Sequence, residues 1–306
     1  MNRLVMTEKP SRFLALVESV LATLIWASSF VLVKLGLEHS GPFTVAGLRY
    51  FLGALFLLPF VIRNGNSINS LPPRLWFRLF LIGLSAYTIG NGALFWGLTY
   101  LSATTAAFLL SLSPILILAM GVLWLKEIPT RLQVAGLIVT LAGSVLFFES
   151  GLNQGELLGI GMVMIALIGF TSFGILGREV ARDQQTDTLT LTTIPLALGG
   201  GLLLVVAFPL EGLPGFSMVV WGIVLWLALI NTALAYILYN HSLQVLTALE
   251  MNVLLNLSPL VTAGLAWFIL GERLGVAQAV AMVIVIVGVI LVQWKKQSHS
   301  CKRIRI

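Results

Sequence analysis

Two carboxylates, Glu18 and Glu250, lie within long apolar stretches of the sequence, where an ionisable side chain is costly and usually functional. A membrane glutamate can take up and release a proton, or its charge can close a gate. Both residues lie about one helical turn from the end of their stretch, which lowers the cost of the charge. The sequence therefore leaves proton coupling and a simple boundary position open for each.

Two cations, Lys34 and Arg49, lie near the ends of the first two apolar stretches. Long basic side chains in such positions commonly extend toward the membrane surface with the charged group in water. We expect this arrangement, with Lys34 beside Glu38. The alternative is that either cation closes a gate or binds a carboxylate.

The remaining reactive residues exclude most catalytic chemistry. The single cysteine, Cys301, cannot form a disulfide within the chain, and His39, His241 and His299 are scattered. No Asp, Glu and His cluster at helical spacing, as an enzyme embedded in the membrane would need. The sequence predicts that the protein is not an enzyme, binds no metal and needs no cofactor.

Neutral polar and aromatic side chains occur deep within the apolar stretches. An amide facing lipid is costly, so these groups are expected to point inward, either to hydrogen-bond between helices or to line a cavity. Two prolines, Pro114 and Pro259, interrupt apolar helices and could act as matched helix breaks facing that cavity. The predicted cavity residues are Trp26, Ser28, Ser29, Tyr87, Asn91, Ser111, Thr171, Ser172, Asn231, Tyr236, Asn252 and Asn256.

The elements that must position these groups are membrane helices. Of the 306 residues, 58% are hydrophobic and only 10% are charged, against roughly 25% charged in soluble domains. A span needs about 20 apolar residues, which predicts an all-α membrane protein of ten transmembrane helices and no soluble domain. The expected spans are 13–35, 43–62, 76–97, 101–124, 131–148, 156–177, 188–208, 217–239, 246–270 and 276–294.

The lysines and arginines predict the orientation of these spans. With the N-terminus in the cytoplasm, only Lys34, Arg49 and Arg273 of the 18 basic residues face outward. This is the bias that cytoplasmic loops carry. We therefore expect both termini in the cytoplasm and an inner or plasma membrane location. The net charge of +6 is then a signal of topology, with no nucleic-acid partner.

The sequence repeats at an offset of 145 residues. Leu112-Ser113-Pro114 matches Leu257-Ser258-Pro259, and Leu125-x-Glu127 matches Leu270-x-Glu272, without a gap. Because each copy has five helices, an odd number, the second must enter the membrane from the opposite side, as in many secondary transporters. We expect a 5+5 inverted repeat: residues 1–12 a cytoplasmic segment, 13–148 the first copy, 156–294 the second, and 295–306 a basic tail.

These features resemble the drug/metabolite transporter superfamily, specifically EamA-type proteins with two tandem repeats. The resemblance rests on Trp26-Ala27-Ser28-Ser29-Phe30, on Leu48-Arg49-Tyr50-Phe51 and on the two Ser-Pro and Leu-x-Glu motifs. It implies a cavity formed by helices 1, 3, 4, 6, 8 and 9, with helices 5 and 10 at the periphery. The layout is similar to that of aromatic amino-acid exporters.

Together these observations predict a transporter that exports amino acids or related small metabolites by alternating access. Its partners would be a small-molecule substrate and the lipid bilayer, and the oligomeric state stays open. The alternative is proton-coupled efflux of drugs or other metabolites, which requires an essential carboxylate such as Glu18 or Glu250.

Overall fold

The computed structural model describes helices and the turns between them. The described residues are 9–63, 71–113, 115–116, 130–148, 155–182, 186–246, 251, 254–255 and 257–293. No strand occurs among them, so the all-helical fold class expected from the sequence is confirmed for this part of the chain. The ranges expected as spans 101–124 and 246–270 are described only in part.

Within the described residues, six helices are long and apolar enough to cross a membrane. Two of them, Pro73–Tyr100 and Met218–Ser242, contain a π-helical segment, labelled η, in the middle. The six are α1 (Arg12–Leu37), α2 (Pro42–Arg63), α3–η3–α4 (Pro73–Gly83, Leu84–Asn91 and Gly92–Tyr100), α8 (Glu156–Arg182), α9 (Thr188–Glu211) and α10–η4–α11 (Met218–Ala228, Leu229–Leu234 and Ala235–Ser242). The shorter helices are α5 (Ala103–Leu110), α7 (Arg131–Phe147), α13 (Ser258–Leu270) and α14 (Val276–Gln293).

Capping side chains set several of the helix starts. A capping box starts α7: Thr130 Oγ1 accepts from the Gln133 amide at 3.3 Å, and Gln133 Oε1 accepts from the Thr130 amide at 2.9 Å. At the equivalent position before α14, Gln278 Oε1 accepts from the Gly275 amide at 3.1 Å. The glutamine half of the capping box therefore recurs before α14, 145 residues after its counterpart at α7.

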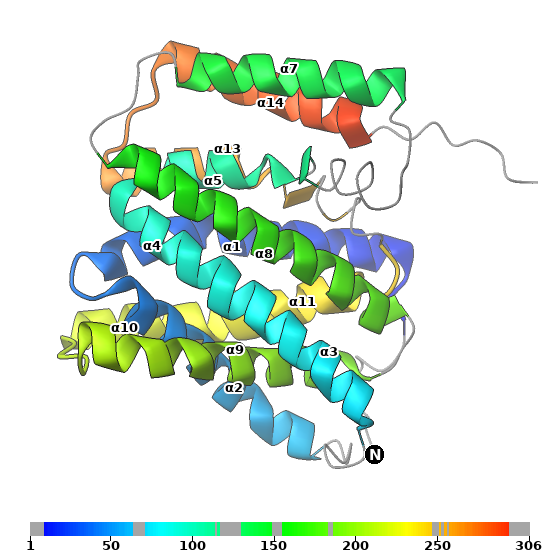
Figure 1. The fold of residues 1–306 in the computed structure, drawn as a ribbon, viewed down its shortest axis with the longest axis vertical. Coiled ribbons are helices and arrows are strands. Elements are labelled where there is room, and N and C mark those ends of the chain that lie inside the picture. Colours follow the sequence, from blue (N-terminus) through cyan, green and yellow to red (C-terminus); the bar gives the residue numbers. More distant parts are fainter. Residues whose placement is uncertain are drawn as a thin grey trace, which may run out of the picture.

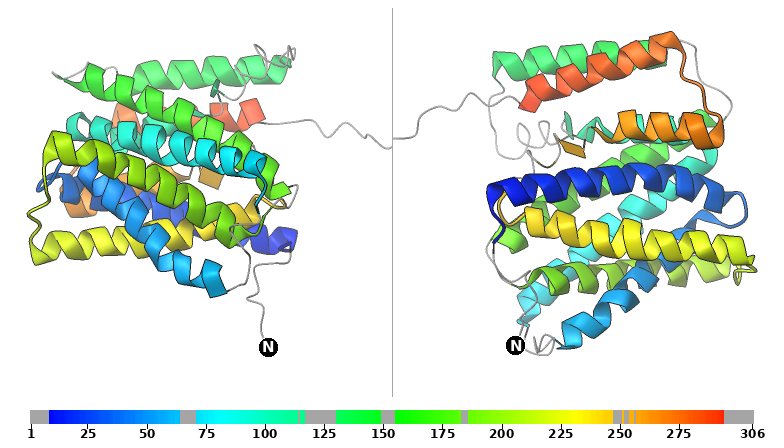
Figure 2. Two further views of the ribbon diagram at one scale, coloured as in Figure 1. Left: turned by 60° about the horizontal axis from the view of Figure 1, so that its bottom comes forward. Right: turned by 180° about the vertical axis from the view of Figure 1, so that it is seen from behind.

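The helices lie side by side around α1. Seen from behind, α1 lies between α13 on one side and α10–α11 on the other, and it contacts all three (Figure 2). On the front, α8 crosses next to α4, while α2 and α9 pack along each other (Figure 1). The pair α7 and α14 lies at one edge of the molecule, where the sequence placed helices 5 and 10.

Glycines allow two of the helix pairs, α2 with α9 and α7 with α14, to approach closely. A Cβ on Gly200 of α9 would lie 2.6 Å from the backbone N of Phe51 on α2. In the edge pair, a Cβ on Gly288 would lie 2.7 Å from the backbone N of Thr140, and one on Gly143 would lie 2.8 Å from a methyl of Val285. Small residues at such crossings let backbones come close and maximise dispersion contact.

Candidate functional site

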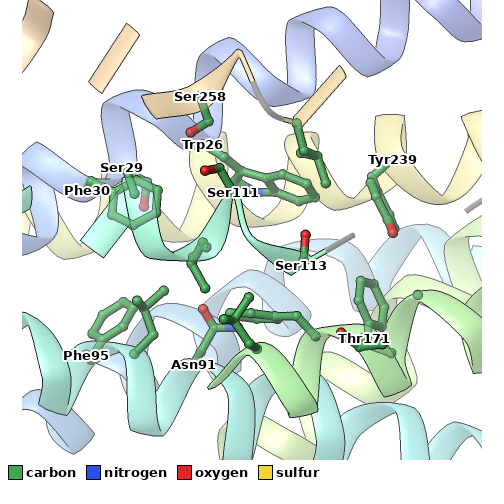
Figure 3. Close-up of a pocket in the computed structure, with 18 of the residues that line it drawn as sticks. Trp26, Ser29, Phe30, Asn91, Phe95, Ser111, Ser113, Thr171, Tyr239 and Ser258 are labelled. Atoms are coloured by element: carbon green, nitrogen blue, oxygen red, sulfur yellow. The ribbon is translucent and has the colours of Figure 1, made fainter. Parts of the chain in front are cut away.

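A cavity of about 180 Å³ lies inside the helix bundle, and its lining comes from α1, α2, η3, α4, α5, α8, α11 and α13. Figure 3 shows Trp26, Ser29 and Ser111 on one side of it, with Asn91 and Thr171 opposite. Thr171 Oγ1 is buried and has no hydrogen-bond partner among the described residues. The cavity therefore presents polar groups inside an apolar bundle. One of them, the Thr171 hydroxyl, can still donate and accept a hydrogen bond.

One wall of the cavity is aromatic. The ring of Trp26 packs edge-on against Tyr236 with centroids 4.9 Å apart, and lies 5.2 Å from the ring of Tyr239. Tyr239 in turn stacks on Phe173 of α8 at 5.4 Å. Such contacts fix the orientation of each ring. The wall presents ordered ring surfaces that suit an apolar or aromatic solute.

Arg49 of α2 reaches this cavity from its buried position. Its guanidinium donates through Nε to Thr232 Oγ1 at 2.7 Å, through Nη1 to Ser29 Oγ at 2.6 Å and through Nη2 to the Asn231 carbonyl at 2.9 Å. Only 3% of the residue is exposed, so the expected extension toward the membrane surface is wrong. Acceptors on α1 and η4, far away in sequence, hold the side chain inside instead.

The π-helical segment η4 supplies two of these acceptors, Thr232 Oγ1 and the Asn231 carbonyl. The Ala235 amide donates to the Ile230 and Thr232 carbonyls and leaves out Asn231, which lies four residues back. The Asn231 carbonyl accepts instead from Trp26 Nε1 at 3.1 Å and from Arg49. π-Helical turns commonly occur at functional sites for this reason. A backbone irregularity thus joins the aromatic wall to the buried cation.

The other π-helical segment has the same feature. In η3 the carbonyl of Ala86 accepts from the side-chain amide of Asn91 at 2.7 Å. Ala86 and Asn231 are 145 residues apart, the offset of the sequence repeat. In both helices a side chain therefore donates a hydrogen bond to the carbonyl at the corresponding position of the repeat, next to the cavity.

Comparison with known proteins identifies the family. The model of the EamA-like transporter family matches this chain twice, at residues 14–149 and 157–294. The chain belongs to the EamA-like transporter family. It is a membrane transporter with two tandem EamA repeats, as the resemblance implied.

Relatives of this EamA-like protein have similar names. A protein of Archaeoglobus fulgidus named an uncharacterized transporter is 27% identical over 90% of this chain and 96% of its own length. YyaM of Bacillus subtilis, also named an uncharacterized transporter, is 27% identical over 86% of this chain and 88% of its own. YedA of Escherichia coli, 24% identical over 91% and 90%, is named an uncharacterized inner membrane transporter.

The fold of the EamA-like chain also matches a solved crystal structure. The TM-score is 0.68 at 18% identity, and the match covers 92% of this chain and 98% of that one. At this identity the likeness concerns the fold alone.

The structure brings six of the predicted cavity residues of this EamA-like transporter together. Four others do not line the cavity: Ser28, Tyr87, Ser172 and Asn231. Ser172 follows Thr171 by about 100° around α8, and its hydroxyl donates to the Ile168 carbonyl instead. Asn252 and Asn256 lie outside the described residues, as do Pro114 and Glu250. The six that line the cavity are Trp26, Ser29, Asn91, Ser111, Thr171 and Tyr236.

Ser28, Tyr87 and Asn231 form a layer behind the cavity wall. Asn231 Nδ2 donates to Ser28 Oγ at 3.0 Å, which ties η4 to α1. The ring of Tyr87 packs at 5.0 Å against Tyr236, which does line the cavity. These residues therefore support the site through interhelical contacts, the other role that the sequence left open for them.

Lys34 and Glu272 bind backbone groups on either side of the turn between α4 and α5. Lys34 Nζ donates to the carbonyls of Leu98 and Leu101, both at 2.7 Å. The carboxylate of Glu272 accepts from the amides of Ala103 and Thr104 at 2.9 and 3.2 Å. A cation at a helix C-terminus and an anion at the next N-terminus both complement the helix dipoles. Lys34 therefore binds within the protein rather than extending to the membrane surface.

Glu18 pairs with a histidine that the sequence analysis set aside. His241 Nδ1 lies 3.0 and 2.9 Å from the two carboxylate oxygens of Glu18, and both residues are buried. Ser242 Oγ is 3.4 Å from the same carboxylate. A carboxylate inside a membrane usually pairs with another polar or charged group. That rule, applied to the histidine two residues beyond the expected span 217–239, is the signal that could have found this pair.

Pro259 lies at the start of a helix. Leu257 donates to the Leu254 carbonyl in a tight turn, and α13 then begins at Ser258 with Pro259 in its first turn. Proline costs little there, because a first-turn amide has no acceptor within the helix. Ser258 lines the cavity, so the helix start adjoins the site.

Four further residues were not predicted from the sequence. Tyr239, Phe173 and Ser113 line the cavity, and the fourth is Glu211. Glu211 accepts from the amides of Phe43 and Thr44 at 2.9 and 2.7 Å and so joins the end of α9 to the start of α2. The helical spacing from Tyr236 to Tyr239 was a usable signal for one of them.

Proposed function

We propose that this transporter exports amino acids or related small metabolites across the inner membrane by alternating access. The observation that carries this proposal is the cavity beside the middle of α1, which combines an aromatic wall with hydroxyl and amide groups. Binding sites for small solutes are concave and mostly apolar, with a few placed polar groups. The partners of the protein are then a small-molecule substrate and the lipid bilayer.

Alternating access follows from ten spans arranged as a 5+5 inverted repeat. The two π-helical segments support this arrangement, because they begin at Leu84 and Leu229, 145 residues apart. Helix contacts support it as well: α2 packs along α9, and α7 along α14. Each of these is a helix and its counterpart in the other repeat, as expected for helices beside a two-fold axis. Two such halves can exchange conformations and so open each side in turn.

Two matched contacts are suited to act as the gates. Lys34 donates to the Leu98 carbonyl, and Arg178 Nη1 donates to the Leu243 carbonyl. Leu98 and Leu243 are 145 residues apart, and Lys34 and Arg178 are 144 apart. In the proposed orientation, with both termini in the cytoplasm, the first contact lies at the outer end of the bundle and the second at the inner end.

Reconstitution tests the proposal. The purified protein is inserted into liposomes, and uptake of a panel of labelled amino acids is measured with and without a pH gradient. Saturable uptake of one group supports the proposal and gives the substrate class. Absence of uptake for every amino acid, with the protein folded and inserted, contradicts it.

Proton-coupled efflux of drugs or other metabolites is the second candidate. The Glu18–His241 pair favours it, because a carboxylate and an imidazole in contact inside the bundle can exchange a proton. In this case an imposed pH gradient drives uptake above the rate seen without one. A rate that does not depend on the gradient rules this mechanism out in favour of facilitated flux.

A further inference from the structure

The charge of Arg49 has no counter-ion in the described structure. Its three hydrogen bonds go to two hydroxyls and one carbonyl, and no carboxylate of the described residues pairs with it. A buried cation without an anion is expensive, because neutral acceptors replace only part of the lost hydration. The residue also lines the cavity. The positive charge of Arg49 therefore acts on any solute that enters the cavity.

The guanidinium retains donors after these contacts. It has five N–H groups, of which Nε, Nη1 and Nη2 use one each. One N–H on each terminal nitrogen is left without an acceptor among the described residues. Two oxygens of a carboxylate can accept from both, and such charge-assisted bonds are stronger than neutral ones.

The surroundings hold Arg49 in place before any ligand arrives. The guanidinium carbon lies 5.0 Å from the ring centroid of Tyr50 and 5.7 Å from that of Phe95. Together with the three hydrogen bonds, these rings fix the side chain in one orientation. A fixed donor loses little entropy on binding, which is the condition for a selective site.

We propose that Arg49 is the recognition residue for the carboxylate of the substrate, so that this protein transports small monocarboxylates with an apolar or aromatic body and rejects amines lacking a carboxylate. The aromatic wall of Trp26, Tyr236 and Tyr239 contacts the body. Thr171 Oγ1, buried without a partner, provides one more hydrogen bond. The proposal rests on the proposed transport function, whose substrate class it narrows, and it opposes efflux of cationic drugs.

Three compounds with the same aromatic body test the proposal: phenylalanine, 3-phenylpropanoate and phenethylamine. The shift in thermal midpoint of the purified protein measures binding, and liposome uptake measures transport. We expect binding of at least one carboxylate compound roughly tenfold tighter or more than binding of the amine, the scale of a charge-assisted bond. Equal or tighter binding of phenethylamine, or binding of neither carboxylate, overturns the proposal.

Variants then assign the effect to Arg49. Arg49→Gln abolishes the preference for carboxylates, Arg49→Lys retains part of it, and Ser172→Ala, outside the cavity, leaves it unchanged. Should Arg49→Gln fail to fold, Arg49→Lys decides the matter, because it keeps the charge but loses the paired N–H groups: an unchanged preference for carboxylates overturns the assignment to Arg49. Carboxylate binding that depends on Arg49 without amino-acid uptake supports this inference and contradicts the proposed function. Amino-acid uptake that persists unchanged in Arg49→Gln supports the proposed function and contradicts this inference.

Discussion

His241 Nδ1 lies 2.9 Å from Oε2 of Glu18, so that a buried imidazole and a buried carboxylate hold α11 against α1. The residues are 223 positions apart in sequence. The contact joins the first helix of one repeat to a helix of the other. It lies two turns along α1 from Trp26, outside the cavity lining. Its effects on stability and on transport can therefore be measured separately.

The first prediction concerns the stability of this pair. Glu18→Leu removes the carboxylate from a buried pair with His241 and should cost about 3–5 kcal/mol of unfolding free energy. The double variant Glu18→Leu/His241→Leu should recover part of that loss, because it leaves no unpaired polar group. Thermal unfolding in detergent measures both. Glu179→Leu, which breaks the half-exposed Arg78–Glu179 pair, serves as the control, with a loss of about 0–1 kcal/mol. Equal losses in the two single variants would contradict the account.

The second prediction concerns coupling. In the proton-driven alternative, Glu18→Gln keeps a hydrogen-bonding side chain but cannot ionise, so the response of uptake to a pH gradient should disappear. Uptake without a gradient should persist. The comparison is made in liposomes at matched protein content. A Glu18→Gln transporter that still responds like the unmodified one excludes Glu18 from coupling.

The third prediction tests the packing of α2 on α9. A Cβ on Gly200 would lie 2.6 Å from the Phe51 amide nitrogen, whereas one on Gly201 meets no atom closer than 3.9 Å. Gly200→Ala should therefore destabilise the protein by about 1–3 kcal/mol. Gly201→Ala, with the same change in helix propensity, should leave stability equal or slightly higher. Equal thermal midpoints for the two variants would show that the helices do not approach this closely.

The fourth prediction tests opening at the outer end, where Glu272 binds the start of α5 next to the proposed Lys34–Leu98 gate. Glu272→Gln removes the charge that accepts from the start of α5, and so should favour opening at that end. In a background of Cys301→Ser and Ser111→Cys, a membrane-impermeant maleimide added outside should label the cavity several-fold faster. Glu211→Gln weakens a similar cap on α2 and is the matched control. A faster reaction in the control alone would place the gate elsewhere.

The sequence predicted the local features of the fold well. Apolar length located α1, expected at 13–35 and observed at Arg12–Leu37, and α9, expected at 188–208 and observed at Thr188–Glu211. The spacing of Thr130 and Gln133 is the sequence pattern of a capping box, and α7 has one. These features depend on residues close together in the chain, which is why a single sequence contains them.

The contacts between distant helices could not be predicted in the same way. Arg49 has the sequence position of a boundary residue, and only the packing of α2 beside η4 gives it acceptors inside the bundle. Nothing local indicates that η4 is π-helical, so the free carbonyl of Asn231 was not foreseen. Thr171 and Ser172 are equally plausible as cavity residues until the rotation of α8 is known.

Thr171 and Ser172, which are adjacent on α8, provide the most direct test of transport through the cavity. Thr171→Trp places an indole in the cavity, whereas Ser172→Trp places it on another side of α8, where Ser172 Oγ donates to the Ile168 carbonyl of the same helix. Uptake of the best amino-acid substrate is measured for both variants in liposomes, after gel filtration and thermal unfolding show that each is folded. The account predicts that uptake falls at least about tenfold in Thr171→Trp and stays near the unmodified rate in Ser172→Trp. A folded Thr171→Trp protein that transports at the unmodified rate would contradict it.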